Sequence, residues 1–197
     1  MISKKITHQQ IQDQAKSLGI ETASLRAVIE VECKSSGFNQ DGTPVILFER
    51  HVMRQRLIAN GKVDVAYRMM RQRPDLCNTI SGGYGLYSAQ HGRLNVAAQY
   101  DRTSALESAS WGLGQVMGYH WKSLGYPSLQ SFINAMYRDE ASQLDAMCRY
   151  IKVNNLINAL KNRDWKAFAR GYNGSAYAKN NYDVKLANAY KKWSTTT

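Results

Sequence analysis

The chain has 197 residues, of which 44% are hydrophobic and 21% charged, a composition typical of one globular domain with a substantial core. Lys and Arg outnumber Asp and Glu by 26 to 15, which gives a net charge of +11. Such a surface favours a polyanionic partner, for example nucleic acid, anionic lipid or an acidic cell-wall polymer. No hydrophobic run approaches the roughly 20 residues of a membrane-spanning helix. Composition excludes such a helix and leaves the choice among polyanions open.

The three cysteines and four histidines are scattered along the chain. An odd number of separate thiols is unlike a disulfide framework, and no pair of these residues has the spacing of structural zinc ligands. The first residues carry charge but no apolar segment follows them, so we expect no secretory signal. We therefore expect reduced thiols, no metal or other cofactor, and synthesis in the cytoplasm.

Two helices are predicted at the start of the chain, over residues 7–18 and 22–33. An apolar stripe at helical spacing runs along the second and consists of Leu25, Val28 and Ile29. Glu32 continues this stripe, whereas Glu30 lies on the opposite face, where we expect it to pair with Arg26. Burying an ionised carboxylate without a partner costs several kcal/mol or makes it take up a proton. Glu32 is therefore a candidate general acid; the alternative is a frayed helix end at which it reaches water.

The next segment combines turn formers, from Gly37 to Pro44, with β-branched and apolar residues from Val45 to Val52. This pattern predicts a polar turn followed by a short strand or hairpin. Strand alternation would place Glu49 and His51 on the same side. Glu49 has an alternative interpretation as an exposed strand residue paired with a neighbouring cation.

The remainder of the chain is predicted to be mostly helical. Residues 54–100 are less regular and favour a helix with a long loop beside a cleft, broken near Ser81–Gly85. Beyond residue 100 we expect helices over residues 103–109, from Asp139 onward, over 165–170 and up to about Trp193. The segments around Trp111–Gly114 and Gly171–Gly174 are expected to be loops.

Several short segments occur in an informative order. They are Val31–Cys33, Ser36–Phe38, Ile46–His51, Ser108–Gly112, Gln115–Gly118 and Ala169–Gly174. This set resembles the N-acetylmuramidase family of phage and prophage endolysins in the lysozyme-like superfamily, and it is also similar to goose-type lysozymes and soluble lytic transglycosylases. The resemblance covers about residues 20–193. Two positions depart from it, since Cys33 stands where Ser is usual and Gly114 where a bulkier residue is usual.

The resemblance implies a mainly α, lysozyme-like α+β fold, with a small β-hairpin or sheet flanking an active-site cleft. We expect one catalytic domain over residues 1–197, with an N-terminal helix at 7–18 and a catalytic core at about 20–193. The peptidoglycan-binding module of some relatives is expected to be absent.

The implied activity is hydrolysis of the β-1,4 bond between N-acetylmuramic acid and N-acetylglucosamine, with Glu32 as the general acid. Glycoside cleavage requires a protonated carboxylic acid and a second group that stabilises the oxocarbenium ion or activates water. A lytic transglycosylase, which forms 1,6-anhydro sugars, is the alternative within the enzyme class. A non-catalytic, basic nucleic-acid-binding protein is the alternative outside it, but it offers no role for an inward-facing Glu32.

Two residues compete for the role of second carboxylate. Asp41 lies nine positions after Glu32, a spacing that resembles phage-type lysozymes. Glu49 lies in the family-like Phe-Glu-x-His segment, on a predicted strand. We favour Glu49, because a strand holds a side chain more rigidly than a glycine-rich turn does.

The resemblance also implies a set of substrate-binding residues, namely Trp111, Gly112, Gln115, Tyr172, Asn173 and His51. Aromatic rings can stack on sugars, amides can bond to N-acetyl groups, and glycine lets backbone approach a ligand. For Trp111 and Tyr172, packing in the core is the alternative.

The expected partner is bacterial peptidoglycan, with no nucleic acid, and the protein is expected to be a monomer. The basic C-terminal helix, Asn181 to Trp193, could dock onto anionic outer-membrane lipopolysaccharide, or it could pack its apolar side on the domain. Without an export signal, such an enzyme would wait in the host cytoplasm until a pore releases it to the periplasm and cell wall.

Overall fold

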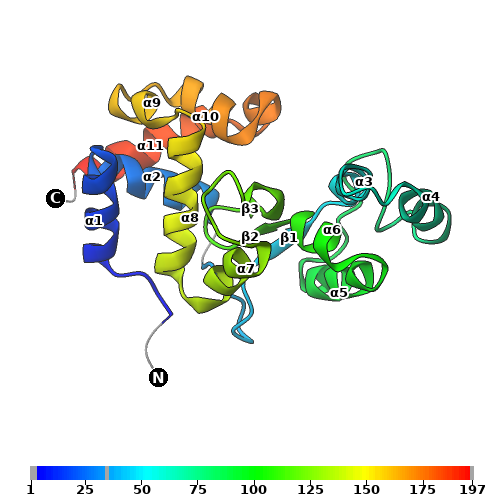
Figure 1. Ribbon diagram of the computed structural model, residues 1–197. Coiled ribbons are helices and arrows are strands. Elements are labelled where there is room, and N and C mark those ends of the chain that lie inside the picture. The colour runs from blue at the N-terminus through cyan, green and yellow to red at the C-terminus, as the bar shows by residue number, and fades with distance from the viewer. Residues whose placement is uncertain (1–3, 34–35, 196–197) are drawn as a thin grey trace.

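The computed structural model describes residues 4–33 and 36–195. These residues form eleven α-helices, three short 3-10 helices (η) and three β-strands (Figure 1). In chain order the elements are α1 (His8–Leu18), α2 (Thr22–Glu32), β1 (Ile46–Phe48), α3 (Arg50–Ala59), α4 (Val63–Gln72), η1 (Tyr87–Ala89), α5 (Gln90–Tyr100), α6 (Arg102–Glu107), β2 (Ala109–Trp111), β3 (Val116–Met117), η2 (Gly118–His120), α7 (Leu129–Arg138), α8 (Glu140–Val153), α9 (Ile157–Lys161), α10 (Trp165–Asn173), η3 (Ser175–Asn180) and α11 (Tyr182–Ser194). The mainly helical fold class with a small sheet is confirmed.

The first two helices match their predicted bounds closely. Thr7 caps α1 through a complete capping box with Gln10. In α2, Leu25 and Val28 are fully buried, so the predicted apolar stripe is the face that packs on the core. Glu32 is the last residue of this helix and therefore lies where the packed face ends.

The three strands form one antiparallel sheet in the order β1-β2-β3. Ile46 lies opposite Trp111 and Phe48 opposite Ala109. The central strand β2 therefore pairs with a strand, β1, that is far from it in sequence. The prediction of a strand from residue 45 to 52 is wrong beyond Phe48, because α3 begins at Arg50. Residues after Glu49 bury side chains at helical spacing, including Met53 and Leu57, and this periodicity outweighs their β-branched neighbours.

The segment from residue 54 to 100 is more helical than expected, because α4 and α5 both form there. The predicted long loop is present between them, and it contains the Ser81–Gly85 break. Similarly, the predicted loop at 171–174 is wrong in part, since α10 continues through Tyr172 to Asn173.

Helix α8 runs through the middle of the molecule, between α1 and α2 on one side and the sheet on the other (Figure 1). Asp139 caps it by accepting a hydrogen bond from the Ser142 amide. Leu144, Met147 and Ile151 are fully buried, so this helix joins the core around α2 to the core around the sheet. The sheet and the ends of α2 and α10 surround one space.

The C-terminal helix α11 packs along α2. Leu186 and Ala189 are buried in that contact. The Trp193 indole donates to Glu30 Oε2 at 2.8 Å, and Lys192 Nζ pairs with the same oxygen at 2.9 Å. The expected Arg26–Glu30 pair is therefore wrong, because α11 supplies the partners of Glu30. The apolar side of α11 faces the domain, in agreement with the packing alternative for this helix.

Within residues 4–33 and 36–195, no helix has the length and apolar character needed to span a membrane.

Candidate active site

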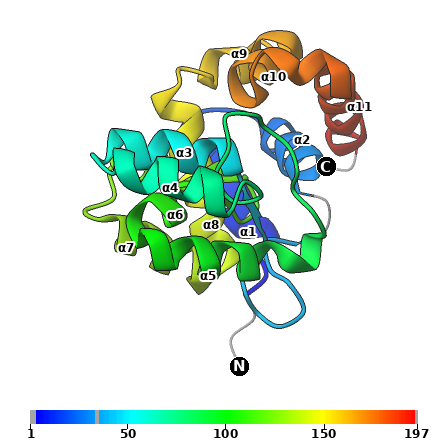
Figure 2. The same cartoon turned by 90° about the vertical axis from the view of Figure 1, so that its right-hand side faces the viewer.

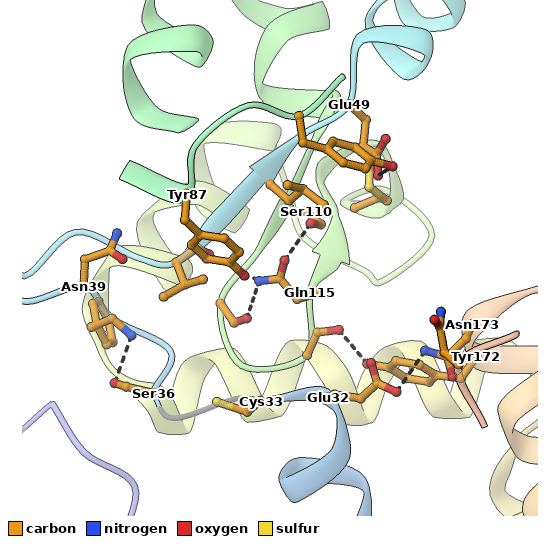
Figure 3. Close-up of a pocket in the computed structure, with 18 of the residues that line it drawn as sticks. Glu32, Cys33, Ser36, Asn39, Glu49, Tyr87, Ser110, Gln115, Tyr172 and Asn173 are labelled. Carbon is orange, nitrogen blue, oxygen red and sulfur yellow. Dashed lines mark hydrogen bonds between the residues drawn. The ribbon is translucent and has the colours of Figure 1, made fainter. Parts of the chain in front are cut away.

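A cavity of about 840 Å³ lies beside the sheet and the end of α2 (Figure 3). Its lining combines carboxylates, amides, hydroxyls, aromatic rings and glycine backbone. The lining residues are Glu32, Cys33, Ser36, Phe38, Asn39, Gln40, Val45, Leu47, Glu49, Tyr84, Tyr87, Ser110, Gly112, Gly114, Gln115, Met117, Tyr172, Asn173, Asn180 and Tyr182. A mixed lining of this kind suits a saccharide, whose rings have apolar faces and polar edges.

Glu32 lies at the C-terminal end of α2, with its carboxyl in this cavity (Figure 3). Burial raises its pKa from 4.5 to about 7, and the hydrogen bond from Asn173 opposes that rise. Asn173 Nδ2 donates to Glu32 Oε1 at 2.9 Å. A carboxyl with a pKa near 7 is protonated in a large fraction of molecules at neutral pH, as a general acid requires.

Tyr172 forms the wall behind Glu32. Its ring stacks on Phe168 at 5.4 Å between centroids, and its hydroxyl donates to the Gly114 carbonyl at 2.8 Å. Burial, and then the neighbouring charge of Glu32, raise the pKa of Tyr172 well above its ordinary value. Tyr172 therefore remains protonated and contributes both to core packing and to the cavity lining.

Glu49 lines the cavity at the end of β1, on the side opposite Glu32 (Figure 3). Its side chain is 16% exposed, and its Oε2 lies 3.3 Å from Nδ1 of His51. The Tyr84 hydroxyl donates to Oε1 at 3.4 Å. Burial raises the pKa of Glu49, whereas His51 and Tyr84 lower it. Glu49 and His51 are neighbours as expected, but the first turn of α3 brings them together and not strand alternation.

Asp41 lies away from the cavity, in the turn between Phe38 and Pro44. It is fully exposed, and its carboxylate accepts hydrogen bonds from the amide and hydroxyl of Thr43 at 2.9 and 2.6 Å. These bonds lower the pKa of Asp41, and the bond from the Thr43 hydroxyl has the larger effect. The residue stabilises its own turn, and the structure does not bring it to Glu32.

The predicted substrate-binding residues divide into two groups. Gly112, Gln115, Tyr172 and Asn173 line the cavity, whereas Trp111 and His51 do not. Trp111 is 1% exposed and its indole donates to the Leu106 carbonyl, so the prediction that it stacks on a sugar is wrong. The reason is strand geometry: Trp111 lies on β2 and points into the core, and its neighbour Ser110 lines the cavity instead. His51 is likewise a neighbour of Glu49 and not a lining residue.

The amide of Gln115 is held in place within the cavity wall. Its Nε2 donates to the Gly112 carbonyl at 2.8 Å, and its Oε1 accepts from the Ser110 hydroxyl at 2.9 Å (Figure 3). Gln115 has a positive φ of 46°, so these bonds maintain a turn that few side-chain-bearing residues adopt. Gln115 therefore stabilises the loop between β2 and β3 as well as lining the cavity.

Two buried polar residues of α8 hold the loops of the cavity, and sequence reasoning missed both. Gln143 Oε1 accepts from the Leu113 amide at 3.0 Å, and its Nε2 donates to the Gly37 carbonyl at 3.2 Å. Glu140 accepts from the Ser36 hydroxyl at 2.8 Å and from the Gly37 amide at 3.0 Å. Their positions on the buried face of a long helix were the available signal, because polar residues there need partners.

Glycine at position 114 is explained by close packing. An added Cβ would lie 2.7 Å from Met147 Cβ and 3.0 Å from the Tyr172 hydroxyl. A bulkier residue, as in the related motif, would therefore displace the wall behind Glu32.

The other departure, Cys33, lines the cavity, while Cys77 and Cys148 are buried. Among residues 4–33 and 36–195, no group of three or more His, Cys, Asp and Glu side chains could hold a metal ion.

A model of the N-acetylmuramidase family matches residues 21–194. The chain belongs to the N-acetylmuramidase family. Among solved structures, the crystal structure of a Burkholderia AP3 phage endolysin is similar, with a TM-score of 0.90 and 42% sequence identity over 98% of this chain and 73% of that chain. A comparison with curated proteins found no match.

Membership of the N-acetylmuramidase family makes this protein a glycoside hydrolase. It favours the enzyme over the alternative of a non-catalytic nucleic-acid-binding protein. The matched region contains every segment on which the resemblance rested, and it extends from the start of α2 to the end of α11.

The hydrogen bond from Asn173 to Glu32 leads to a prediction about pH dependence. Because this bond favours the ionised form, Asn173→Ala should raise the pKa of Glu32 above about 7. If Glu32 acts as an acid, the basic limb of the kcat/KM profile will move to higher pH, whatever the change in maximal rate. The matched control is Asn158→Ala, at an exposed position of α9. A basic limb that stays in place, or moves to lower pH, would contradict the assignment.

Proposed function

We propose that this protein is an endolysin that hydrolyses the β-1,4 bond between N-acetylmuramic acid and N-acetylglucosamine in peptidoglycan, with Glu32 as the general acid. The observation that carries the proposal is the Glu32 carboxyl in a saccharide-sized cavity, with a pKa raised to about 7 by burial. The family supports peptidoglycan as the substrate, and the similarity to a phage endolysin supports a role in lysis of the host.

In the proposed mechanism, Glu32 donates its proton to the glycosidic oxygen as the bond to the anomeric carbon breaks. The leaving sugar departs as an alcohol, and positive charge develops on the ring oxygen and anomeric carbon. Water then adds to that carbon and loses a proton to a carboxylate. To close the cycle, Glu32 regains a proton from solvent and the second carboxylate releases the one it accepted, so that the net reaction consumes one water.

We propose Glu49 as the carboxylate that accepts this proton. Its side chain lines the cavity and is 16% exposed, and its Oε2 lies 3.3 Å from Nδ1 of His51. Its location on the cavity side opposite Glu32 suits a water molecule that approaches the sugar from the other face (Figure 3).

The choice between Glu49 and Asp41 leads to a prediction with a matched pair of variants. Glu49→Gln should lower kcat by about 10²-fold or more, because general-base contributions are of that size. Asp41→Asn should change kcat less than twofold, because this carboxylate lies in an exposed turn. Turbidity loss of permeabilised cells and rates on soluble glycan strands would measure both. Normal activity of Glu49→Gln together with inactive Asp41→Asn would reverse the assignment.

Product analysis distinguishes hydrolysis from lytic transglycosylation. We expect digests of purified sacculi to contain reducing N-acetylmuramic acid ends, since Glu49 offers a base for water. A preponderance of 1,6-anhydro-muropeptides in mass spectra would show that the muramic acid hydroxyl, and not water, attacks the anomeric carbon.

The net charge of +11 is consistent with an anionic cell-wall polymer as the partner. Long-range attraction of this kind raises the rate of encounter and weakens with salt. The basic residues of α11 remain at the surface, although its apolar side packs on α2. Attraction to the wall therefore needs no insertion of this helix into lipid.

A further inference from the structure

The loop between α4 and α5 carries aromatic side chains into the cavity that neither the family motifs nor sequence reasoning singled out. Figure 2 shows this segment as a long loop that leaves α4 and returns to the start of α5. Tyr84 and Tyr87 both line the cavity from this loop. The two residues are 36% and 56% exposed, respectively, although both belong to the cavity lining. Glycines at 82, 83 and 85, all with positive φ, give the loop its course.

Two residues from neighbouring elements hold the loop against the sheet. Arg50, in the first turn of α3, donates from Nε to the Ile80 carbonyl at 3.0 Å and from Nη2 to the Ser81 carbonyl at 3.3 Å. The backbone of Gly83 lies directly over this guanidinium, since an added Cβ would be 2.8 Å from Arg50 Cζ. The base of the loop is thus bound to the residue that immediately follows Glu49.

Gln90 provides the second anchor and is itself only 1% exposed. Its Nε2 donates to the Tyr84 carbonyl at 2.7 Å and to the Leu86 carbonyl at 3.0 Å. Its Oε1 accepts from the Phe48 amide, in β1, at 3.0 Å. A single buried amide therefore sets the position of Tyr84 relative to β1, the strand that ends just before Glu49.

These anchors bring the Tyr84 hydroxyl to Glu49 Oε1, to which it donates at 3.4 Å. The other oxygen, Oε2, lies 3.3 Å from Nδ1 of His51. The carboxylate therefore has a polar neighbour at each oxygen. Burial, followed by the negative charge of Glu49, raises the pKa of Tyr84, so its hydroxyl remains a donor at working pH.

We propose that Tyr84 is a positioning residue for Glu49: its hydroxyl at Oε1, together with His51 at Oε2, fixes the rotation of the carboxylate that lines the cavity. The loop that carries Tyr84 is then part of the catalytic arrangement, with Arg50 and Gln90 as its supports. This inference rests on the proposed role of Glu49, and it adds a residue to which no motif assigns a part.

The test is Tyr84→Phe, which removes only the hydroxyl from a partly exposed ring. We expect kcat to fall about tenfold, the usual scale for a hydrogen bond to a charged group, with KM changed less than twofold. In the parent, the hydrogen bond from Tyr84 lowers the pKa of Glu49. Its loss should raise that pKa, so the acidic limb of the kcat profile should also move to higher pH. The other titratable groups near this carboxylate are His51, from α3, and Tyr119, from η2, and both remain in the variant.

Tyr67→Phe is the matched control, because Tyr67 lies on α4 at 52% exposure and does not line the cavity. The double variant Tyr84→Phe with Glu49→Gln should be no slower than Glu49→Gln alone, since the hydroxyl acts through the carboxylate. If Tyr84→Phe leaves kcat and the acidic limb unchanged, or raises only KM, the inference is wrong while the proposed function stands. If Glu49→Gln itself retains activity, the role proposed for Glu49 fails first, and the two failures are distinguishable.

Discussion

Glu32→Gln should lower kcat by about 10³-fold or more, with little change in KM. The amide keeps the shape of the side chain and can accept the hydrogen bond from Asn173, but it has no proton to donate to the glycosidic oxygen. The loss therefore falls on the transition state and leaves ground-state binding intact. Steady-state rates on soluble glycan strands, together with binding of an unreactive oligosaccharide by calorimetry, would separate the two quantities.

Glu30→Gln is the matched control, because it makes the same change two residues earlier on the outer face of α2. Glu30 pairs with Lys192 and Trp193 of α11, so its loss should affect stability by less than about 1 kcal/mol and leave kcat nearly unchanged. Retention of more than a tenth of the parent kcat by Glu32→Gln would refute the general-acid assignment.

The same substitution should stabilise the protein above neutral pH. In the folded chain the pKa of Glu32 is about 7, compared with 4.5 for the ordinary group. The folded state therefore holds a proton that the unfolded state has released between these values, and the stability of the parent falls as pH rises from about 4.5 to 7. Glutamine has no such dependence. At pH 8.5 the variant should exceed the parent by about 1–3 kcal/mol in the free energy of unfolding, and this difference should vanish at pH 4.

Denaturant unfolding of the parent and of Glu32→Gln at the two pH values measures this difference directly. The Glu30→Gln variant, whose carboxyl is exposed, should show no comparable gain at high pH. An equal gain for Glu32→Gln at pH 4 and pH 8.5 would mean that improved packing, and not the removal of a buried charge, is responsible. If Glu32→Gln is inactive and is more stable than the parent only at pH 8.5, then the buried carboxyl of the parent lowers its stability in return for catalysis.

Local features of the chain were predicted well, because their causes lie within a few residues. The helix over residues 7–18, the apolar stripe that continues to Glu32 and the helix that opens at Asp139 all form as their patterns indicate. Each depends on helical periodicity or on a side chain that reaches a nearby amide.

The errors arise where a partner distant in sequence decides the outcome. Trp111 was expected in a loop at the sugar sites, but pairing with β1 makes it a strand residue whose ring is buried. Glu30 was expected to pair with Arg26, but α11 provides Lys192 and Trp193. Neither partner can be inferred from the residues that surround the site in sequence, since both follow from the packing of whole elements.

The sequence by itself determined the helical class, the helix that carries Glu32 and the ordered motifs that place the chain in its family. Only the tertiary structure decided that Glu32 is buried beside Asn173 and Tyr172, that Glu49 stands at a strand end on the other side of the cavity, and that Tyr84 reaches it from a distant loop. The physical reason is that helix formation depends on local propensity and capping, whereas a raised carboxyl pKa depends on how much water the surrounding elements exclude.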